Sequence, residues 1–395
     1  MKGAQPTLAQ LFLTFLKIGA TAFGGNVALV AAVRNEICDR RGWLKEEMLL
    51  DATTIGNLLP GALAVNVTSA LGYRIHGLAG ALLSMAGVLL PSFVLVCVLS
   101  ALYFRFGNNE NITLLFNSLL PAVAAVIAAT VWQLFRKNVT TLTQGIVALL
   151  AAVTLFFSKS FIATIVVIAL GAAAGILFMK KSSEAIQKPQ TARSRGPVLF
   201  AATLLVAGLI IWLIQPQGIA AVVKQLTLTF GSISVTLFGG GYVFVPVIRD
   251  VVVNQMHWVT EREFFDGIAL GQVTPGPIMI SAAFIGWKQA GIWGALGGTA
   301  GTFLPPAALM LIATQFTDRL RGNALVEAIF RGVRPAVIGM IAASVVYIAR
   351  SGPLNWQAAL IFAVVLWLSL KTKISQALLV PGGGLLGWLL YTVFG

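Results

Sequence analysis

Charged residues are scarce in this chain. Asp, Glu, Lys and Arg make up only 10% of its 395 residues, whereas 58% are hydrophobic. An ordinary soluble domain carries a charge on roughly a quarter of its residues. The composition therefore excludes such a domain. At about 20 apolar residues for each crossing, it predicts roughly ten to twelve membrane-spanning segments.

Cysteine and histidine are almost absent. Cys38 and Cys97 are too few for a disulfide framework and lack metal-ligand spacing, and His76 lies far from His257. The sequence contains no Walker-type phosphate loop, so ATP does not drive the protein directly. A membrane-embedded enzyme would need paired carboxylates, a metal cluster or an activated nucleophile, and no convincing set is present. We expect no metal, no cofactor and no enzymatic activity.

Acidic residues are fewer than basic ones. Lys and Arg number 27 against 13 Asp and Glu, which gives a formal net charge of +14. Cytoplasmic loops of membrane proteins are routinely rich in Lys and Arg, and we assign most of the excess to them. A path for an anionic substrate is the second explanation. Nothing resembles an aromatic-interleaved basic surface or a DNA-binding motif, so we expect no nucleic-acid partner.

The chain contains an internal repeat, which is the strongest signal in the sequence. Phe23-Gly24-Gly25 recurs as Phe238-Gly239-Gly240, an offset of 215 positions (238 minus 23). The matching residues at that offset are Arg34 with Arg249, Trp43 with Trp258, Asp51 with Asp266, Asn57 with Gln272, and Pro60-Gly61 with Pro275-Gly276. After one residue is dropped, the offset of 214 pairs Gly72 with Gly286, Gly77 with Gly291, Pro91 with Pro305, and Pro121 with Pro335.

A hydrophilic stretch separates the two copies. Residues 180–197 carry five basic residues against one Glu, which places this linker in the cytoplasm by the positive-inside rule. We therefore predict a first membrane repeat at 1–179, a cytoplasmic basic linker at 180–197 and a second membrane repeat at 198–395.

Each repeat contains a backbone break. Proline lacks an amide proton and glycine has low helix propensity, so no helix passes unbroken through Pro60-Gly61 or through Thr274 to Pro277. Residues 43–73 and 260–287 should each form a broken or re-entrant hairpin. Irregular backbone at membrane depth is tolerated only where it is buried in protein or lines a cavity, and transporters hold substrates at such breaks.

The relative orientation of the halves follows from their basic residues. These gather after the first span in the first half but four elements later in the second, at Arg319, Arg321, Arg331 and Arg334. This opposite placement favours inversion, whereas a count of spans favours parallel halves, and we give the charge bias more weight. The predicted fold is an all-α polytopic membrane protein with two homologous helical halves, each with a broken or re-entrant hairpin, arranged as inverted repeats.

Three motifs point to a known family. FLKIGATAFGGN, RRGWLKEEMLLDATTIGNLLPG and FFDGIALGQVTPGP, with their two-fold repetition, resemble the chromate ion transporter family. The resemblance covers nearly the whole chain except the linker and the segment after it. It implies a fused pair of homologous membrane domains that exports chromate, although related sequences handle other anions. The first half departs from the family pattern at Asn26, Asn57 and Ala62, so we expect the second hairpin to contribute more to substrate handling.

The two breaks supply the candidate substrate site. A helix that resumes at Gly61 or Gly276 presents unpaired amide protons and a partial positive charge, which suit an oxyanion. The predicted contacts are Gly24, Gly25, Asn57, Pro60, Gly61, Gly239, Gly240, Gln272, Thr274, Pro275, Gly276 and Pro277. The structural alternative is that the glycines only permit close helix packing. On the functional interpretation, Gly276→Ala should reduce transport more than Gly61→Ala.

Charged residues near the breaks are further candidates. Lys17 lies inside an apolar run, where it either serves the substrate or extends its ammonium to the membrane interface. Arg34 and Arg249 either anchor the interface or capture the anion. Asp51 and Asp266 either carry a coupling proton, form ion pairs with these two arginines, or face water, and we favour the pairing.

The leading hypothesis is a secondary transporter that exports chromate or a similar tetrahedral oxyanion across the bacterial inner membrane. A channel or a transporter for another small anion is the first alternative, and a membrane-embedded enzyme is a weaker one. The expected partners are a small inorganic anion such as chromate or sulfate and the lipid bilayer, with a homodimer as one option for assembly.

Overall fold

A computed structural model describes residues 5–22, 25–57, 59–106, 110–158, 161–178, 196–236, 244–315, 324–372 and 374–394. The predicted site residues Gly24, Gly239 and Gly240 lie outside these ranges, as does most of the predicted linker. Within these ranges the chain is helical and contains no strand, which confirms the predicted all-α class.

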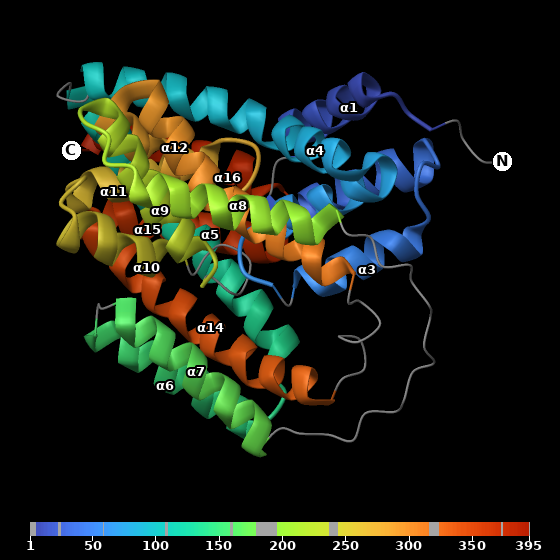
Figure 1. The fold of residues 1–395 in the computed structure, drawn as a ribbon. Helices are drawn as coiled ribbons and strands as arrows, with labels where there is room; N and C mark the ends of the chain where they lie inside the picture. The colour runs from blue at the N-terminus through green and yellow to red at the C-terminus, as the bar shows by residue number, and fades with distance from the viewer. Residues whose placement is uncertain are drawn as a thin grey trace. The chain divides into compact units, whose positions relative to one another are not determined.

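The helices run in chain order, and Figure 1 shows their course. They are α1 (Leu8–Thr21), α2 (Gly25–Val33), α3 (Glu46–Gly56), α4 (Leu63–Phe106), α5 (Glu110–Asn138), α6 (Leu142–Phe157), α7 (Phe161–Phe178), α8 (Gly196–Leu213), α9 (Ile219–Ser234), α10 (Phe244–Arg249), α11 (Glu261–Val273), α12 (Ser281–Thr314), α14 (Ala324–Ser351), α15 (Trp356–Lys371) and α16 (Gln376–Phe394). Two π-helical segments, Arg34–Arg40 and Asp250–Gln255, follow α2 and α10.

Four helical segments of the described residues are long and apolar enough to cross a membrane. They are Leu63–Phe106, Leu114–Asn138, Ile278–Thr314 and Ala324–Ser351. Other apolar helices are shorter, such as α1 with 14 residues and α6 with 16. At 1.5 Å per residue a 14-residue helix is about 21 Å long, short of the roughly 30 Å hydrocarbon core. Four segments of the described chain therefore meet the length criterion, and the number of crossings stays a prediction.

The sequence repeat is matched by a repeat in backbone conformation. The helix of α4 is interrupted at Gly77 (φ 59°, ψ −145°), and that of α12 at Gly291 (φ 55°, ψ −140°), exactly one repeat later. Each interruption folds the chain back on itself. A Cβ on Gly72 would lie 2.3 Å from the carbonyl oxygen of Gly80, and one on Gly286 would lie 2.1 Å from that of Gly294.

Two compact units divide the chain, and each draws on both sequence repeats. The first contains residues 1–98, 185–241 and 274–321, and the second contains residues 99–184, 242–273 and 322–395. The boundaries at 1–179, 180–197 and 198–395 remain predictions about the evolutionary repeats rather than about these units.

In the first unit, corresponding helices of the two repeats pack in the same way. A Cβ on Gly87 of α4 would lie 2.9 Å from the carbonyl oxygen of Phe12 on α1. One on Gly301 of α12 would lie 2.5 Å from that of Thr227 on α9, which is the same contact one repeat later. A core of buried residues, including Leu11, Phe15 and Leu29 among others, joins α1, α2, α3 and α4.

In the second unit, α14 packs along α6 and α7, which lie side by side (Figure 1). Small residues allow this approach. A Cβ on Gly332 of α14 would lie 1.9 Å from the carbonyl oxygen of Gly171 on α7, and one on Gly339 would lie 2.0 Å from that of Ala148 on α6. Helix α5 packs against α15 and α16 in the same unit.

This packing predicts a loss of stability for Gly332→Ala. The added methyl group overlaps the α7 backbone, so the cost should reach or exceed the roughly 1–3 kcal/mol typical of overpacking. Gly382→Ala on α16 is the matched control, because nothing lies within 4 Å of its Cβ position. Thermal unfolding of the purified proteins in detergent measures the difference, and equal midpoints for the two variants would contradict the tight α7–α14 contact.

Candidate functional site

The first break separates α3 from α4. Gly61 has a φ of +94°, a left-handed conformation that favours glycine. The carbonyl oxygen of Pro60 accepts a hydrogen bond of 2.8 Å from Nδ2 of Asn66, and both groups are buried. Asn57, by contrast, is exposed and donates its side-chain amide to the carbonyl of Thr53 at 2.8 Å. The Asn57 side chain therefore stabilises the end of α3.

The second break lies between α11 and α12. Thr274, Pro275, Gly276 and Pro277 are all buried, and Gly276 has a φ of +115°. A single 3₁₀ turn, Ile278–Ile280, leads into α12. The break predicted from the prolines and glycine is thus present, with its backbone enclosed by protein.

Each break packs against the long helix of the other repeat. The Cβ position of Gly61 lies 2.4 Å from Cβ of Pro306 on α12, and that of Gly276 lies 3.1 Å from Oγ of Ser92 on α4. Pro306 and Ser92 correspond at the offset of 214, so the two contacts are reciprocal. All four residues belong to the first unit. Such an exchange is the arrangement expected of two repeats related by a pseudo-twofold axis.

The two contacts differ in polarity. The first break meets a proline ring, whereas the second meets a fully buried hydroxyl that donates to the carbonyl of Leu89 at 2.9 Å. The two breaks also differ in how much room they leave for a methyl group, and the order is opposite to the expected one. A methyl group on Gly61 would collide with Pro306, while one on Gly276 would only press against Ser92. Gly61→Ala therefore perturbs the packing more, and the two alanine variants do not compare the transport roles of the breaks.

Arg34 and Arg249 form equivalent ion pairs. Arg34 lies 2.8 Å from Glu46, and Arg249 lies 2.5 Å from Glu261. The two glutamates correspond at the offset of 215 and begin α3 and α11. The expected pairing of Asp266 with Arg249 is therefore wrong. The sequence already contained evidence for the correct partners, because the two glutamates correspond at the repeat offset just as the two aspartates do.

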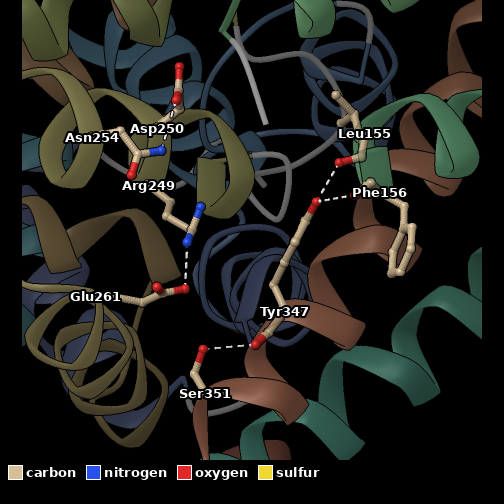
Figure 2. A network of polar contacts seen from close by, with 8 residues as sticks. All are labelled: Leu155, Phe156, Arg249, Asp250, Asn254, Glu261, Tyr347 and Ser351. Carbon is tan, nitrogen blue, oxygen red and sulfur yellow. Dashed lines mark hydrogen bonds and ion pairs between the residues drawn. The ribbon is translucent and has the colours of Figure 1, made fainter. Parts of the chain in front are cut away.

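Burial distinguishes the two pairs. The side chain of Arg34 is 54% exposed, whereas that of Arg249 is 7% exposed. Figure 2 shows the surroundings of Arg249, whose guanidinium carbon lies 5.6 Å from the ring centre of Tyr347. The Tyr347 hydroxyl donates to the carbonyl oxygens of Leu155 and Phe156, at 2.6 and 2.9 Å. The guanidinium of Arg249 is thus already paired with a carboxylate, and an anion would have to displace Glu261 to bind it.

Lys17 lies exposed on α1, and its charge acts on Glu36. Glu36 accepts hydrogen bonds of 2.9 Å from both Arg40 and Arg41. Burial alone would raise the pKa of Glu36, but the bond from Arg41 and the charges of Arg40 and Lys17 hold it below its usual range. Lys17 therefore helps to stabilise an acidic side chain in the π-helical segment after α2.

The two candidate carboxylates differ in their surroundings. Asp51 is partly buried on α3, whereas Asp266 on α11 is only 1% exposed. Oδ2 of Asp266 accepts a hydrogen bond of 2.7 Å from the Tyr103 hydroxyl, and its Oδ1 has no hydrogen-bond partner. Nε2 of Gln272, later on the same helix, is likewise buried without a partner. Tyr103 could not be found from sequence, since it lies 163 residues from Asp266.

Comparison with known proteins covers both repeats. A family model described as chromate transporter matches residues 9–176 and 224–388. A chromate transport protein from Cupriavidus metallidurans is 30% identical over 98% of this chain and 94% of its own length. A chromate transport protein from Pseudomonas aeruginosa is 31% identical over 97% and 92%. An uncharacterized transporter from Methanocaldococcus jannaschii is 27% identical over 98% and 96%. No solved structure matches the chain.

The unequal burial predicts unequal stability effects of Arg249→Gln and Arg34→Gln. Breaking a buried ion pair costs about 3–5 kcal/mol, and half-exposed Glu261 should keep the cost of Arg249→Gln at or below the lower end. Arg34→Gln should cost under about 1 kcal/mol, because its pair is largely in water. Denaturation of both variants in detergent tests this, and an equal loss would mean that Tyr347 and burial add nothing to the second pair.

Proposed function

Because this chain belongs to the chromate transporter family, we propose that it exports chromate, or a similar tetrahedral oxyanion, across the bacterial inner membrane as a secondary transporter. The family model covers both repeats, and the chain contains helices long and apolar enough to cross a membrane. Its relatives are named as transport proteins rather than enzymes. Outward direction rests on the resemblance to chromate exporters, and a secondary mechanism on the lack of a phosphate-binding loop in the sequence.

The observation that carries this proposal is the reciprocal packing of the two breaks. Gly61 meets Pro306 and Gly276 meets Ser92, so both interruptions are buried by the long helix of the other repeat. Backbone that leaves a helix inside an apolar protein is usually kept for a ligand or a path. Amide protons at a resumed helix and its partial positive charge favour an anion over a cation.

We assign the main anion contacts to the second break. Its Gly276 lies next to the Ser92 hydroxyl, which can donate to an oxyanion after giving up its bond to Leu89. The first break offers a proline ring at the equivalent place. The remaining predicted contacts, including Asn57, Gln272, Arg34, Arg249 and Lys17, stay proposals, as do sulfate transport and a homodimer.

Transport by the purified protein in lipid vesicles tests the function. With chromate, sulfate and molybdate offered in turn, we expect accumulation against the chromate gradient when a proton or electrical gradient is imposed. A channel would only equalise the anion on both sides, because it has no coupled step. Vesicles with no protein set the background, and equilibration without accumulation for all three anions would reject the transporter in favour of a channel.

Ser92→Ala tests the location of the substrate site. A hydrogen bond to a charged group contributes about 1.5–3 kcal/mol, so the chromate KM should rise about tenfold or more. The control is Ser84→Ala on the same helix, because Ser84 is also fully buried but its hydroxyl has no partner. An unchanged KM for Ser92→Ala, at equal amounts of folded protein, would place the substrate elsewhere.

A further inference from the structure

We propose that the Asp266 carboxyl, positioned by Tyr103, is a proton-binding site whose proton is carried together with the anion. The proposal rests on the proposed function and adds the identity of the coupled ion. It also assigns the coupling to one half of the molecule.

The Asp266 carboxyl group is held in place, but only one of its two oxygens accepts a hydrogen bond. Oδ2 accepts the Tyr103 hydroxyl at 2.7 Å, while the buried Oδ1 has no donor. Tyr103 is itself held by edge contacts with the rings of Phe104 and Phe116, each with centres 5.1 Å apart. A carboxylate normally accepts several hydrogen bonds, and a buried acceptor without a donor costs the desolvation of that group.

A proton on Oδ1 resolves this deficit. The proton comes from water, forms an O–H bond with Oδ1 and changes the group from a carboxylate to a neutral carboxylic acid. Oδ2 keeps its bond from Tyr103 in both states, so binding and release need no rearrangement of the side chain. Burial disfavours the charged form, whereas the Tyr103 hydrogen bond favours it. The site can therefore exchange its proton instead of remaining in one state.

The neighbouring charges do not force Asp266 into either its charged or its neutral form. On α11 itself, Nε of Arg262 lies 3.8 Å from Oδ2, and Glu263 is the closest like charge, engaged with the backbone of Thr260. Arg262 is half exposed and also donates to Asn117 of α5 at 3.1 Å. The two charges on α11 are opposite in sign and act against each other.

Within the described parts of the chain, Arg262 is the cation that forms an ion pair with Asp266. On α4, which supplies Tyr103, Arg105 lies over the ring of Phe106. On α10, Arg249 is engaged by Glu261, and α16 contains no charged residue. The charged residues of α14 are Glu327, Arg331, Arg334 and Arg350, of which Glu327 and Arg331 pair with each other. Those of α5 lie at its two ends: Glu110, Arg136 and Lys137.

The sign of the coupling follows from charge. Asp266 lies seven residues before the end of α11 at Val273, which is about 10 Å along the helix. A carboxylate at that distance repels an anion held at the following break, and at an effective dielectric constant near 20 its neutralisation should tighten anion binding roughly tenfold or more. By linkage the anion tightens proton binding by the same factor. Proton and anion therefore bind together. A chromate dianion accompanied by one proton still carries a net negative charge outward, so an inside-negative membrane potential drives export in spite of the coupled proton. The equivalent but less buried Asp51 does not share this role.

The test uses full-length protein in vesicles, with chromate as the probe. Two assays are compared: chromate exchange at equal pH on both sides, and chromate accumulation driven by a pH gradient. In wild type we expect both, with proton movement recorded by a pH dye when chromate is added. Since chromate itself takes up protons near neutral pH, each variant is compared with wild type at the same pH.

Asp266→Asn should still exchange chromate, with only the pH dependence that the protonation of chromate itself causes, and should lose gradient-driven accumulation and the dye signal. Asp51→Asn, the repeat counterpart, should keep both. Tyr103→Phe removes the bond that favours the charged form, so the pH midpoint of exchange should move up by roughly one unit.

Accumulation by Asp266→Asn equal to that of wild type would overturn the proposal. If this variant does not fold, an unchanged pH profile for Tyr103→Phe would overturn it instead. Wild-type exchange without any proton-driven accumulation would reject the proton site alone. Absence of wild-type exchange would reject the proposed function itself, and this inference with it.

Discussion

The structure depends on how two stretches of non-helical backbone are kept inside an apolar protein. A helix satisfies its own amides and carbonyls, but the chain at Pro60-Gly61 and at Thr274 to Pro277 does not, and every such group needs another partner or burial against protein. Asn66 bonds the carbonyl of Pro60, and the long helices of opposite repeats cover both glycines. This requirement explains why the repeats are intertwined within one compact unit: a repeat alone would leave its break uncovered.

The repeats share a framework but differ where chemistry is possible. Their turns at Gly77 and Gly291 and their π-helical segments recur in register. At three equivalent positions, however, the second repeat has the more buried or more polar environment. Ser92 replaces a proline against its break, its arginine is enclosed by protein, and its aspartate is buried against a tyrosine. Divergence in this direction would leave one repeat as support and concentrate the proposed ligand contacts in the other.

The sequence predicted the features that single residues impose on the backbone. Glycine and proline act locally, so both breaks could be located from Pro60-Gly61 and Pro275-Gly276, and the repeat followed from their register. The covering contacts could not be predicted, because nothing in the sequence indicates which helix meets Gly61. Pairing of Arg249 with Glu261 rather than Asp266 depends on the three-dimensional course of the chain between α10 and α11, and helix length depends on where each apolar run bends.

The two ion pairs give the repeats different resistance to movement. In each, an arginine where the π-helical segment begins, Arg34 within the first segment and Arg249 directly before the second, holds the glutamate at the start of the helix that leads to the break. Rotating α3 away from its segment would expose groups already half in water, and such a pair contributes under about 1 kcal/mol. Moving α11 in the same way would strip a buried guanidinium of the Glu261 carboxylate and of its contact with Tyr347, which costs several times more. Because π-helical turns occur often at functional sites and store an extra residue, both segments can act as joints, but the first opens at lower cost. An alternating mechanism built on this chain would therefore be asymmetric: the first hairpin would move more readily, whereas movement of the second would first have to meet the cost of releasing Arg249.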